Sequence, residues 1–384
     1  EMRQILLDAC AMDWANISPE IFGSLFQSVM DKEQRRHLGA HYTSEENILK
    51  VISSLFLDEL RAEFEEIKSR GKGKARTSAL DMFHRKLAGL TFLDPACGCG
   101  NFLVVAYREL RLLELEVIEQ LYQKGQLLEV GTVVRCNVNQ FFGLEIEEFP
   151  AQIARVAMWL VDHQMNLLVS EHFGVHFARI PLRESADIRH TNALQMDWPV
   201  TDYIFGNPPF LGKTYQSKSQ KEDLARVCFN IPAAGNLDFV AGWYVKAAQM
   251  MNEHPNIITA FVSTNSITQG EQVPILWSWM LAQGIKILFA HRTFQWKSAA
   301  KGKAAVHCVI ICFSKKDKNN KKIFFYEDIK SRPCEIKAKQ INPYLIDAAN
   351  VILQKRGDPI CAVTKMRYGS KPADGGFSGC SGWF

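Results

Sequence analysis

Short apolar runs alternate along the chain with longer segments in which apolar residues recur at helical spacing. This alternation is typical of an α/β fold in which helices connect the strands of a mostly parallel sheet. The apolar runs predict strands at 90–94, 140–145, 202–206, 257–263, 285–291, 304–313 and 323–326. Helical spacing predicts helices from Glu45, from near Leu103, at 151–168 and at 236–251. The last two strands, joined by a short charged turn, predict an antiparallel hairpin at the sheet edge.

The pattern also divides the chain into three parts. Residues 1–88 are predicted to form a helical segment, in which Ser18-Pro19-Glu20 has the composition of a helix start and Ser44 is placed to cap the next helix. Residues 89–330 hold the predicted strands. From Ser331 onward proline and polar residues increase, so 331–384 is predicted to begin a further unit. Because the first residue is Glu1, we expect the chain to be a piece of a longer protein.

Asn207-Pro208-Pro209-Phe210 follows the predicted strand 202–206 directly. In open α/β sheets, ligands bind at the carboxyl ends of the strands. Neither proline has an N–H, and Pro209 holds Pro208 extended, so the Pro208 carbonyl is a fixed acceptor beside the Asn207 side-chain oxygen. Two acceptors with Phe210 as a stacking surface suit a planar ring that carries an exocyclic amine. The alternative is an ordinary turn closed by these residues.

A glycine loop follows the strand that ends at Asp94. Gly98 and Gly100 allow the backbone to approach a ligand closely, and the helix that starts after them supplies free N–H groups. A dinucleotide fingerprint would have a third glycine at position 103, where Leu103 stands, and the acid before the loop would repel a phosphate. The loop therefore favours a ligand with a cationic end, S-adenosylmethionine, over NAD.

Two further strand ends carry candidate ligands for the same molecule. Glu145 follows the apolar run 140–144, where its carboxylate can accept both ribose hydroxyls. Glu147 and Glu148 follow, and any of the three acids could instead cap the next helix. Asn192 follows a weaker strand signal and is placed to lie near an adenine ring.

Two polar stretches interrupt the pattern. Residues 68–76 contain five basic side chains and two glycines, which predicts a solvated loop in preference to a phosphate-binding one. Residues 212–235 are too long for an ordinary connection, so we expect a substrate-binding or closing loop beside the site.

Composition narrows the class of protein. The 384 residues carry a net charge of +4, which permits a nucleic-acid partner without requiring one. The ten cysteines are scattered, and the close pairs Cys97/Cys99 and Cys308/Cys312 have no clustered histidine, so we expect no metal site and reduced thiols. No run is long and apolar enough to span a membrane, and no signal peptide opens the chain, so we expect a cytoplasmic protein.

Asp94-Pro-Ala-Cys-Gly-Cys-Gly-Asn-Phe102, then Glu145, then Asn207-Pro-Pro-Phe210 resemble the motifs of class I S-adenosylmethionine-dependent DNA adenine-N6 methyltransferases. Their order resembles that of the gamma group. More specifically, the segments 38–44, 235–244 and 291–296 are similar to those of the MmeI-like restriction–modification proteins. The resemblance runs from about Ser18 to about Phe377, and it implies a Rossmann-like class I methyltransferase fold.

The resemblance also implies roles for individual residues. S-adenosylmethionine would contact Tyr42, Thr43, Asp94, Ala96, Gly98, Gly100, Phe102, Glu145, Ile146 and Asn192. Many relatives have Asp where Asn192 stands. The flipped adenine would be held by the catalytic residues Asn207, Pro208, Pro209 and Phe210, with Phe294 stacked on its other face. Double-stranded DNA would be the partner, and the nuclease and the complete target-recognition domain of the family would belong to a longer protein.

Three alternatives to adenine-N6 transfer are open. The same two acceptors suit the exocyclic amine of cytosine, which gives cytosine-N4 methylation, and protein or RNA methylation is a further alternative. A DNA-binding or specificity subunit could retain the methylase scaffold without catalysis. Cytosine-C5 transfer would need a thiol nucleophile after the prolines, where Phe210 stands.

Overall fold

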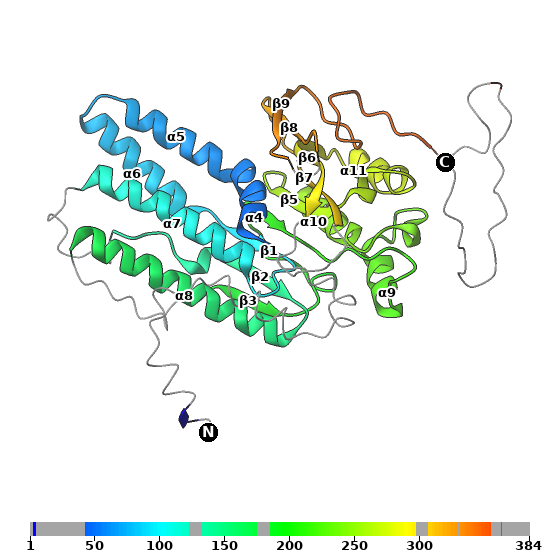
Figure 1. Ribbon diagram of the computed structural model, residues 1–384, viewed down its shortest axis with the longest axis horizontal. Helices are drawn as coiled ribbons and strands as arrows, with labels where there is room; N and C mark the ends of the chain where they lie inside the picture. Colours follow the sequence, from blue (N-terminus) through cyan, green and yellow to red (C-terminus); the bar gives the residue numbers. More distant parts are fainter. Residues whose placement is uncertain are drawn as a thin grey trace.

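The computed structural model describes residues 3–4, 43–122, 133–174, 185–296, 306–328, 331–354 and 362. Within these residues, one sheet runs through the molecule with the strand order β3-β2-β1-β4-β5-β7-β6-β8-β9 (Figure 1). The strands are β1 Phe92–Asp94, β2 Phe141–Glu145, β3 Asp187–His190, β4 Tyr203–Gly206, β5 Ile258–Thr264, β6 Lys286–Trp296, β7 Val306–Ser314, β8 Lys321–Phe325 and β9 Cys334–Ala338. The predicted α/β fold and the predicted apolar strands are confirmed.

Strands β1 to β5 are mutually parallel, and their order reverses between β1 and β4. The reversal matters because ligands of open α/β sheets bind at the carboxyl ends of the strands, at the point where the strand order reverses. β1, β2 and β4 end at Asp94, Glu145 and Gly206, so the motifs singled out in the sequence meet at this point.

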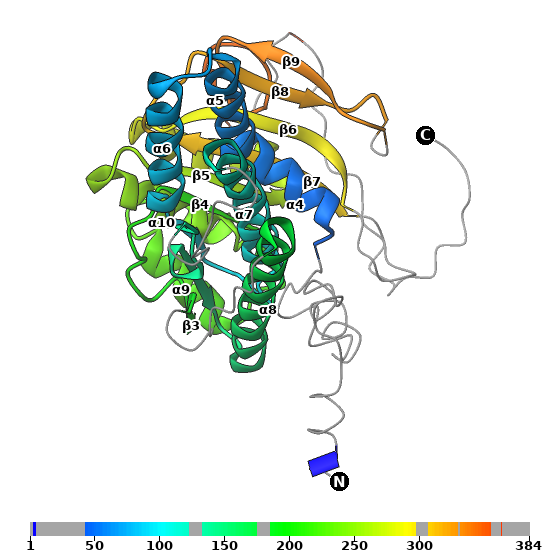
Figure 2. The same ribbon diagram turned by 90° about the vertical axis from the view of Figure 1, so that its left-hand side faces the viewer.

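Helices cover both faces of the sheet (Figures 1 and 2). One layer consists of α4 Glu45–Ile52, α5 Asp58–Ser69, α6 Lys74–Gly89, α7 Asn101–Leu121 and α8 Glu148–Phe173. The other consists of α9 Lys218–Val227, α10 Ala241–Glu253 and α11 Ser278–Ala282. The sheet supplies alternate residues to the two layers: Phe92 packs under the first and Leu93 under the second. Continuous apolar runs follow from this burial on both faces.

Short helical turns complete the described chain. π-helical turns lie at Ser53–Leu57 and Val273–Trp277, and 3-10 turns lie at Val138–Gln140, Ala234–Asn236 and Asn265–Thr268. Helix α4 begins after Ser44 as predicted, although the Ser44 side chain makes no capping hydrogen bond. Apart from residues 3–4, the part of the predicted helical segment that precedes Thr43 lies outside the described residues. None of the described helices is long and apolar enough to cross a membrane.

The predicted edge hairpin has different partners from those expected. β7 does not pair with β8; it lies between β5 and β6 and is antiparallel to both. Its central residues are buried whichever face they point to, including Val309, Ile310 and Ile311, and this burial is typical of an interior strand. The antiparallel hairpin at the edge is formed by β8 and β9 instead. Because β9 lies beyond residue 331, the sheet continues past the predicted domain boundary, and the division into three parts stays a prediction.

Two polar stretches are also more regular than predicted. The basic run is a helix–helix turn, since α5 ends at Ser69 and α6 begins at Lys74. Lys68 pairs with Glu65 and Arg70 with Glu66, so two of its charges are neutralised by the preceding helix. The stretch 212–235 contains α9, whose N-terminus is closed by a capping box between Ser217 and Gln220. The prediction of a loop is wrong for residues 68–69 and 74–76 of the first stretch and for about half of the second, where α9 and a 3-10 turn form.

A buried charged network holds the outer helices together. Arg111 of α7 is 2% exposed, and its guanidinium lies 3.1 Å from a Glu114 carboxylate oxygen and 3.0 Å from Asp162 of α8. Glu114 also accepts a hydrogen bond from the His84 ring of α6 at 2.8 Å. Three helices of this layer are therefore joined through mutually compensating charges.

Candidate functional site

The catalytic motif predicted from the sequence lies at the tip of β4. The Asn207 amide nitrogen donates to the Thr43 hydroxyl at 3.3 Å, which brings the residue before α4 against the strand end. The Asn207 side-chain oxygen is buried and has no hydrogen-bond partner among the described residues. Leaving a buried acceptor unpaired costs about 1–3 kcal/mol. This cost marks the Asn207 oxygen as a place where a ligand's donor would be stabilising.

The segment after Asn207 is held firmly. Pro208 is buried, and the half-buried Phe210 packs against both hydrophobic layers. Leu211 donates its backbone N–H to Asp238 at 2.8 Å, and its carbonyl accepts the N–H of Phe239 at 3.0 Å. The segment before α10 therefore clamps the motif in place. Asp238 belongs to the 235–244 segment noted in the sequence, but its role as a clamp was not foreseen.

Gly206 brings the β1 and β4 ends into direct contact. A Cβ atom at Gly206 would lie 2.5 Å from Asp94 Oδ1, closer than any real contact of that kind. Only glycine therefore allows the Asp94 carboxylate to lie against the backbone immediately before Asn207. This contact joins the predicted cofactor loop to the predicted catalytic motif.

The glycine loop after β1 is shaped as its sequence predicts. Gly98 and Gly100 have positive φ angles of 54° and 84°, which favour glycine. A Cβ at Gly100 would lie 3.1 Å from the Ala154 side chain, whereas the space around a Cβ at Gly98 is open. Gly100 is thus required by packing against α8, and Gly98 leaves room for a ligand to approach the backbone.

Two carboxylates border this loop. Asp94 is 1% exposed and accepts the Ala96 N–H at 3.0 Å, while Glu145 accepts the N–H groups of Gly98 and Glu147, each at 2.9 Å. Burial raises the pKa of Asp94 to about 8, opposed by the Ala96 hydrogen bond and reinforced by Glu145. Burial also raises the pKa of Glu145. A cationic ligand would relieve this cost, because it stabilises the ionised carboxylates.

Asn192 lies beside these groups but is not free to turn. It follows β3, whose last residue His190 pairs with Glu145, and its side-chain oxygen accepts the Leu194 N–H at 3.0 Å. The Asn192 amide nitrogen donates to Asp223 of α9 at 2.8 Å. Asp223 was missed in the sequence because no local pattern connects it with a residue 31 positions earlier.

The other predicted site residues are placed unequally. Ala96 is half-buried in the glycine loop, and Phe102 at the start of α7 is buried against Phe205, with ring centroids 6.0 Å apart. Ile146 is 53% exposed beside Glu145. Tyr42 lies outside the described residues. Most of the predicted cofactor residues therefore lie at the ends of neighbouring strands or in the loops that follow them, namely Asp94, Ala96, Gly98, Gly100, Glu145, Ile146 and Asn192. Thr43 instead precedes α4, and Phe102 belongs to the first turn of α7.

Phe294 differs from the prediction of an available stacking surface. It is 1% exposed, its ring stacks on Tyr326 with centroids 5.2 Å apart, and the Lys50 ammonium lies 5.5 Å from the ring centre. A base could stack on Phe294 only after one of these neighbours moved. Its role in base binding stays a prediction.

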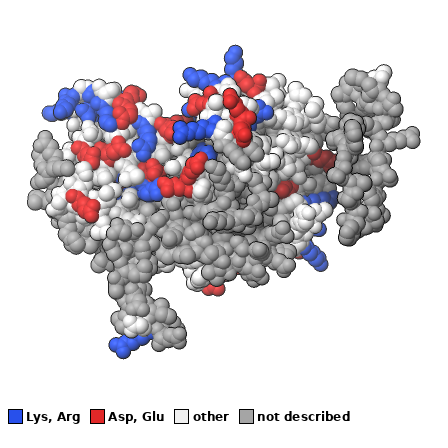
Figure 3. Space-filling view, viewed as in Figure 1, with Lys and Arg blue, Asp and Glu red and all other residues white. Residues whose placement is uncertain are grey.

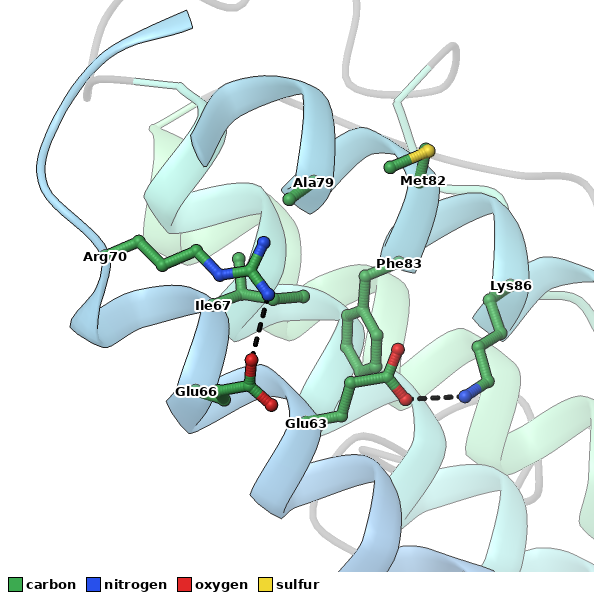
Figure 4. A pocket seen from close by; sticks show the side chains of 8 residues that line it. All are labelled: Glu63, Glu66, Ile67, Arg70, Ala79, Met82, Phe83 and Lys86. Atoms are coloured by element: carbon green, nitrogen blue, oxygen red, sulfur yellow. Dashed lines mark hydrogen bonds and ion pairs between the residues drawn. The ribbon is translucent and has the colours of Figure 1, made fainter. Parts of the chain in front are cut away.

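A shallow pocket of about 440 Å³ lies elsewhere, between α5 and α6 (Figure 4). Ile67 and Phe83 line it, and ion pairs of Glu63 with Lys86 and Glu66 with Arg70 border it. None of its residues belongs to the strand ends, so it is separate from the candidate site. Figure 3 shows acidic and basic side chains intermixed over these helices and over the β8–β9 edge. Among the described residues, no group of three or more His, Cys, Asp or Glu side chains is placed to hold a metal ion.

The strand order and the glycine loop after β1 define a Rossmann-like class I methyltransferase fold. The model of the MmeI DNA-methyltransferase domain matches residues 68–326, and the chain belongs to this family. The family predicted from the sequence motifs is thereby confirmed.

Similar proteins agree with this assignment. DNA methyltransferase A of Bacillus subtilis (strain 168) is 38% identical over 375 residues, which are 95% of this chain and 41% of the relative. The solved structure of the type IIL restriction–modification enzyme MmeI in complex with DNA is 57% identical, with a TM-score of 0.90, and the match covers 97% of this chain and 50% of that one. A putative type II restriction enzyme and methyltransferase of Methanocaldococcus jannaschii is 24% identical over 168 residues, 38% of this chain and 14% of the relative. The chain thus spans half or less of the length of these relatives.

Proposed function

We propose that this chain transfers a methyl group from S-adenosylmethionine to the N6 amine of an adenine flipped out of double-stranded DNA. The observation that carries the proposal is the buried, unpaired side-chain oxygen of Asn207 at the tip of β4, directly after Gly206, the residue against which the Asp94 carboxylate lies. An exocyclic amine is the donor that this oxygen lacks. The family and the relatives that act on DNA support the choice of substrate.

The residues around the glycine loop fit S-adenosylmethionine. Asp94 would hold the ammonium of the methionine end, since both the burial and the raised pKa of this carboxyl favour a cationic partner. Glu145 would accept the ribose hydroxyls, because each of its oxygens accepts one backbone N–H and retains a second lone pair. The open space at Gly98 would admit the ligand against the backbone. When bound, the cofactor supplies a methyl group on a positively charged sulfur.

Asn207 and Pro208 would act on the target amine by position. The adenine N6 lone pair is delocalised into the ring, and hydrogen bonds from N6 to the Asn207 oxygen and the Pro208 carbonyl favour a pyramidal nitrogen. Holding the amine in this geometry contributes by orientation and electrostatics without a covalent intermediate. Phe210 would stack on the base and return part of the few kcal/mol that flipping requires. The contact between Gly206 and Asp94 keeps the two halves of the site in register.

Cytosine-N4 transfer would use the same acceptors and is the second candidate. A scaffold without catalysis is the third. Because the chain covers only part of its relatives, a nuclease and a target-recognition domain in a longer protein are part of the same proposal.

The test is transfer of a tritiated methyl group to unmodified DNA by the full-length protein, followed by analysis of the modified nucleoside. We expect N6-methyladenine. Asn207→Ala should slow single-turnover transfer by an amount that corresponds to about 2.7–4 kcal/mol, with little change in cofactor affinity. Asn252→Ala is the matched control, since Asn252 lies at the exposed end of α10 and, among the described residues, its side chain bonds only to the Gln283 and Lys315 side chains there, at 3.3 Å and 2.6 Å.

Each other outcome contradicts a distinct part of the proposal. N4-methylcytosine as the product would replace adenine with the second candidate. A folded protein that binds the cofactor but methylates no DNA would favour the scaffold. Near-parental transfer by Asn207→Ala would remove Asn207 from the mechanism.

A further inference from the structure

Asp223 is a buried carboxylate whose contacts have no part in the function described so far. It lies in α9 next to Leu224, which is buried in the core between the sheet and helices α9 to α11. Asp223 itself is 5% exposed. Its oxygens accept from the Asn192 amide at 2.8 Å and from the Gln195 amide at 2.8 Å, with the Arg226 guanidinium at 3.5 Å. A carboxylate buried to this degree needs such donors, because losing water costs it several kcal/mol.

The pairing settles which way the Asn192 amide faces. An asparagine side chain can present either its oxygen or its nitrogen, and the two ends are similar in shape. An ionised Asp223 only accepts, so it selects the nitrogen of Asn192. The Leu194 N–H only donates, so it selects the oxygen. If the amide were turned over, its oxygen would face the Asp223 carboxylate and its nitrogen would face the Leu194 N–H. Neither pair could then form a hydrogen bond. The orientation is therefore fixed by chemistry from both sides.

We propose that Asp223 is the positioning residue for recognition of the cofactor's adenine. It holds Asn192 so that the oxygen, with one lone pair left after the Leu194 hydrogen bond, faces the adenine amine. This inference rests on the proposed binding of S-adenosylmethionine. Asn192 with Asp223 behind it presents an acceptor as reliably as a carboxylate does, without placing a third carboxylate at position 192 beside Asp94 and Glu145.

The experiment compares two ligands of the full-length protein by titration calorimetry. S-adenosylhomocysteine has a donor amine on its ring, and S-inosylhomocysteine has an acceptor oxygen at the same position. The parent protein should bind the adenosyl ligand at least about tenfold more tightly. The difference combines one hydrogen bond gained by the adenosyl ligand with the repulsion between the inosyl oxygen and the Asn192 oxygen. Asp223→Asn allows either end of the Asn192 amide to face the ligand. The preference should then fall by about threefold or more.

Two further variants separate positioning from general support of the fold. Gln195→Ala removes the other amide bound to Asp223 and should leave the preference unchanged. The double variant Asn192→Asp with Asp223→Asn exchanges the partners, so that residue 192 again presents only an acceptor, and the parental preference should return. Restoration of selectivity by exchange is not expected of a residue that only stabilises α9.

The outcomes distinguish this inference from the proposed function. Undiminished preference in folded Asp223→Asn overturns the positioning role while cofactor binding stands. Where Asp223→Asn is too unstable to titrate, the double variant decides: recovery of both stability and parental preference supports the inference, because both then depend on the pairing between positions 192 and 223, whereas equal affinity for the two ligands or a double variant as unstable as Asp223→Asn overturns it. A parent protein that binds neither ligand overturns the proposed function and this inference with it.

Discussion

Replacing Gly206 with Ala would bring the β4 end into collision with the Asp94 carboxylate. The new methyl group would lie 2.5 Å from Oδ1 and 3.0 Å from Cγ of Asp94. Because real contacts of this kind are longer, either the carboxylate or the strand end must shift by roughly 0.5–1 Å, and overpacking of this size costs about 1–3 kcal/mol. A moving carboxylate would also lose its 3.0 Å hydrogen bond from Ala96.

The expected result has two parts. The melting temperature should fall by about 2–4 °C per kcal/mol of lost stability. Affinity for S-adenosylhomocysteine should fall about tenfold or more, as a loss of 1.4 kcal/mol or more requires. Thermal unfolding and calorimetric titration measure the two effects. Gly212→Ala is the control, because a Cβ there meets nothing within 4 Å. If Gly206→Ala matched Gly212→Ala in both measurements, the contact between the two halves of the site would be refuted.

Three other substitutions test separate parts of the structure. Glu145→Ala should weaken cofactor binding by about 1.5–3 kcal/mol per lost charge-assisted hydrogen bond, and unchanged affinity in calorimetry would exclude Glu145 from the site. Asp94 has a pKa raised to about 8, above the ordinary value of about 3.9, so the folded state holds its proton more tightly than the unfolded chain does. This carboxyl should therefore lower the free energy of unfolding as pH rises from about 4 to about 8, and denaturant titrations of Asp94→Asn should lack that part of the slope. Arg111→Met removes the guanidinium that Glu114 and Asp162 share in the core and should cost about 3–5 kcal/mol. The surface pair of Arg85 with Asp81, whose side chains are 72% and 32% exposed, provides the comparison, since Arg85→Met should cost only about 0–1 kcal/mol. Equal costs would show that the Arg111 network carries no special weight.

The strands and the two central motifs could be predicted because their signals are local. Each of these signals, an apolar run that ends at Asp94 or shortly before Asn207, lies within ten residues of the sequence. The α/β class of fold follows because such runs alternate with helical segments along the chain. The basic run illustrates a local signal that was overlooked. Lys68 and Arg70 stand three and four residues after Glu65 and Glu66, the spacing of ion pairs along one face of a helix.

Other features depend on residues far apart in the chain. The place of β7 is decided by which strands offer an edge, and the sequence next to β7 gives no information about β5. Helix α9 has few apolar positions, since one narrow face with Leu224 and Val227 is enough to anchor it, so its polar surface resembles that of a loop. The unpaired oxygen of Asn207 depends on Thr43, which lies 164 residues earlier. Such contacts cannot be derived from spacing alone.

The position of β7 imposes an order on folding during synthesis. Both neighbours of β6, β7 and β8, follow it along the chain, so β6 leaves the ribosome before it has any partner in the sheet. At the same stage β5 is paired with β4 alone, and its other edge, in a strand buried on both faces, is open until β7 arrives. Open apolar edges pair readily with other chains. Between the synthesis of β6 and of β7, the nascent protein therefore has two open apolar strands, β5 and β6, at which other chains could pair.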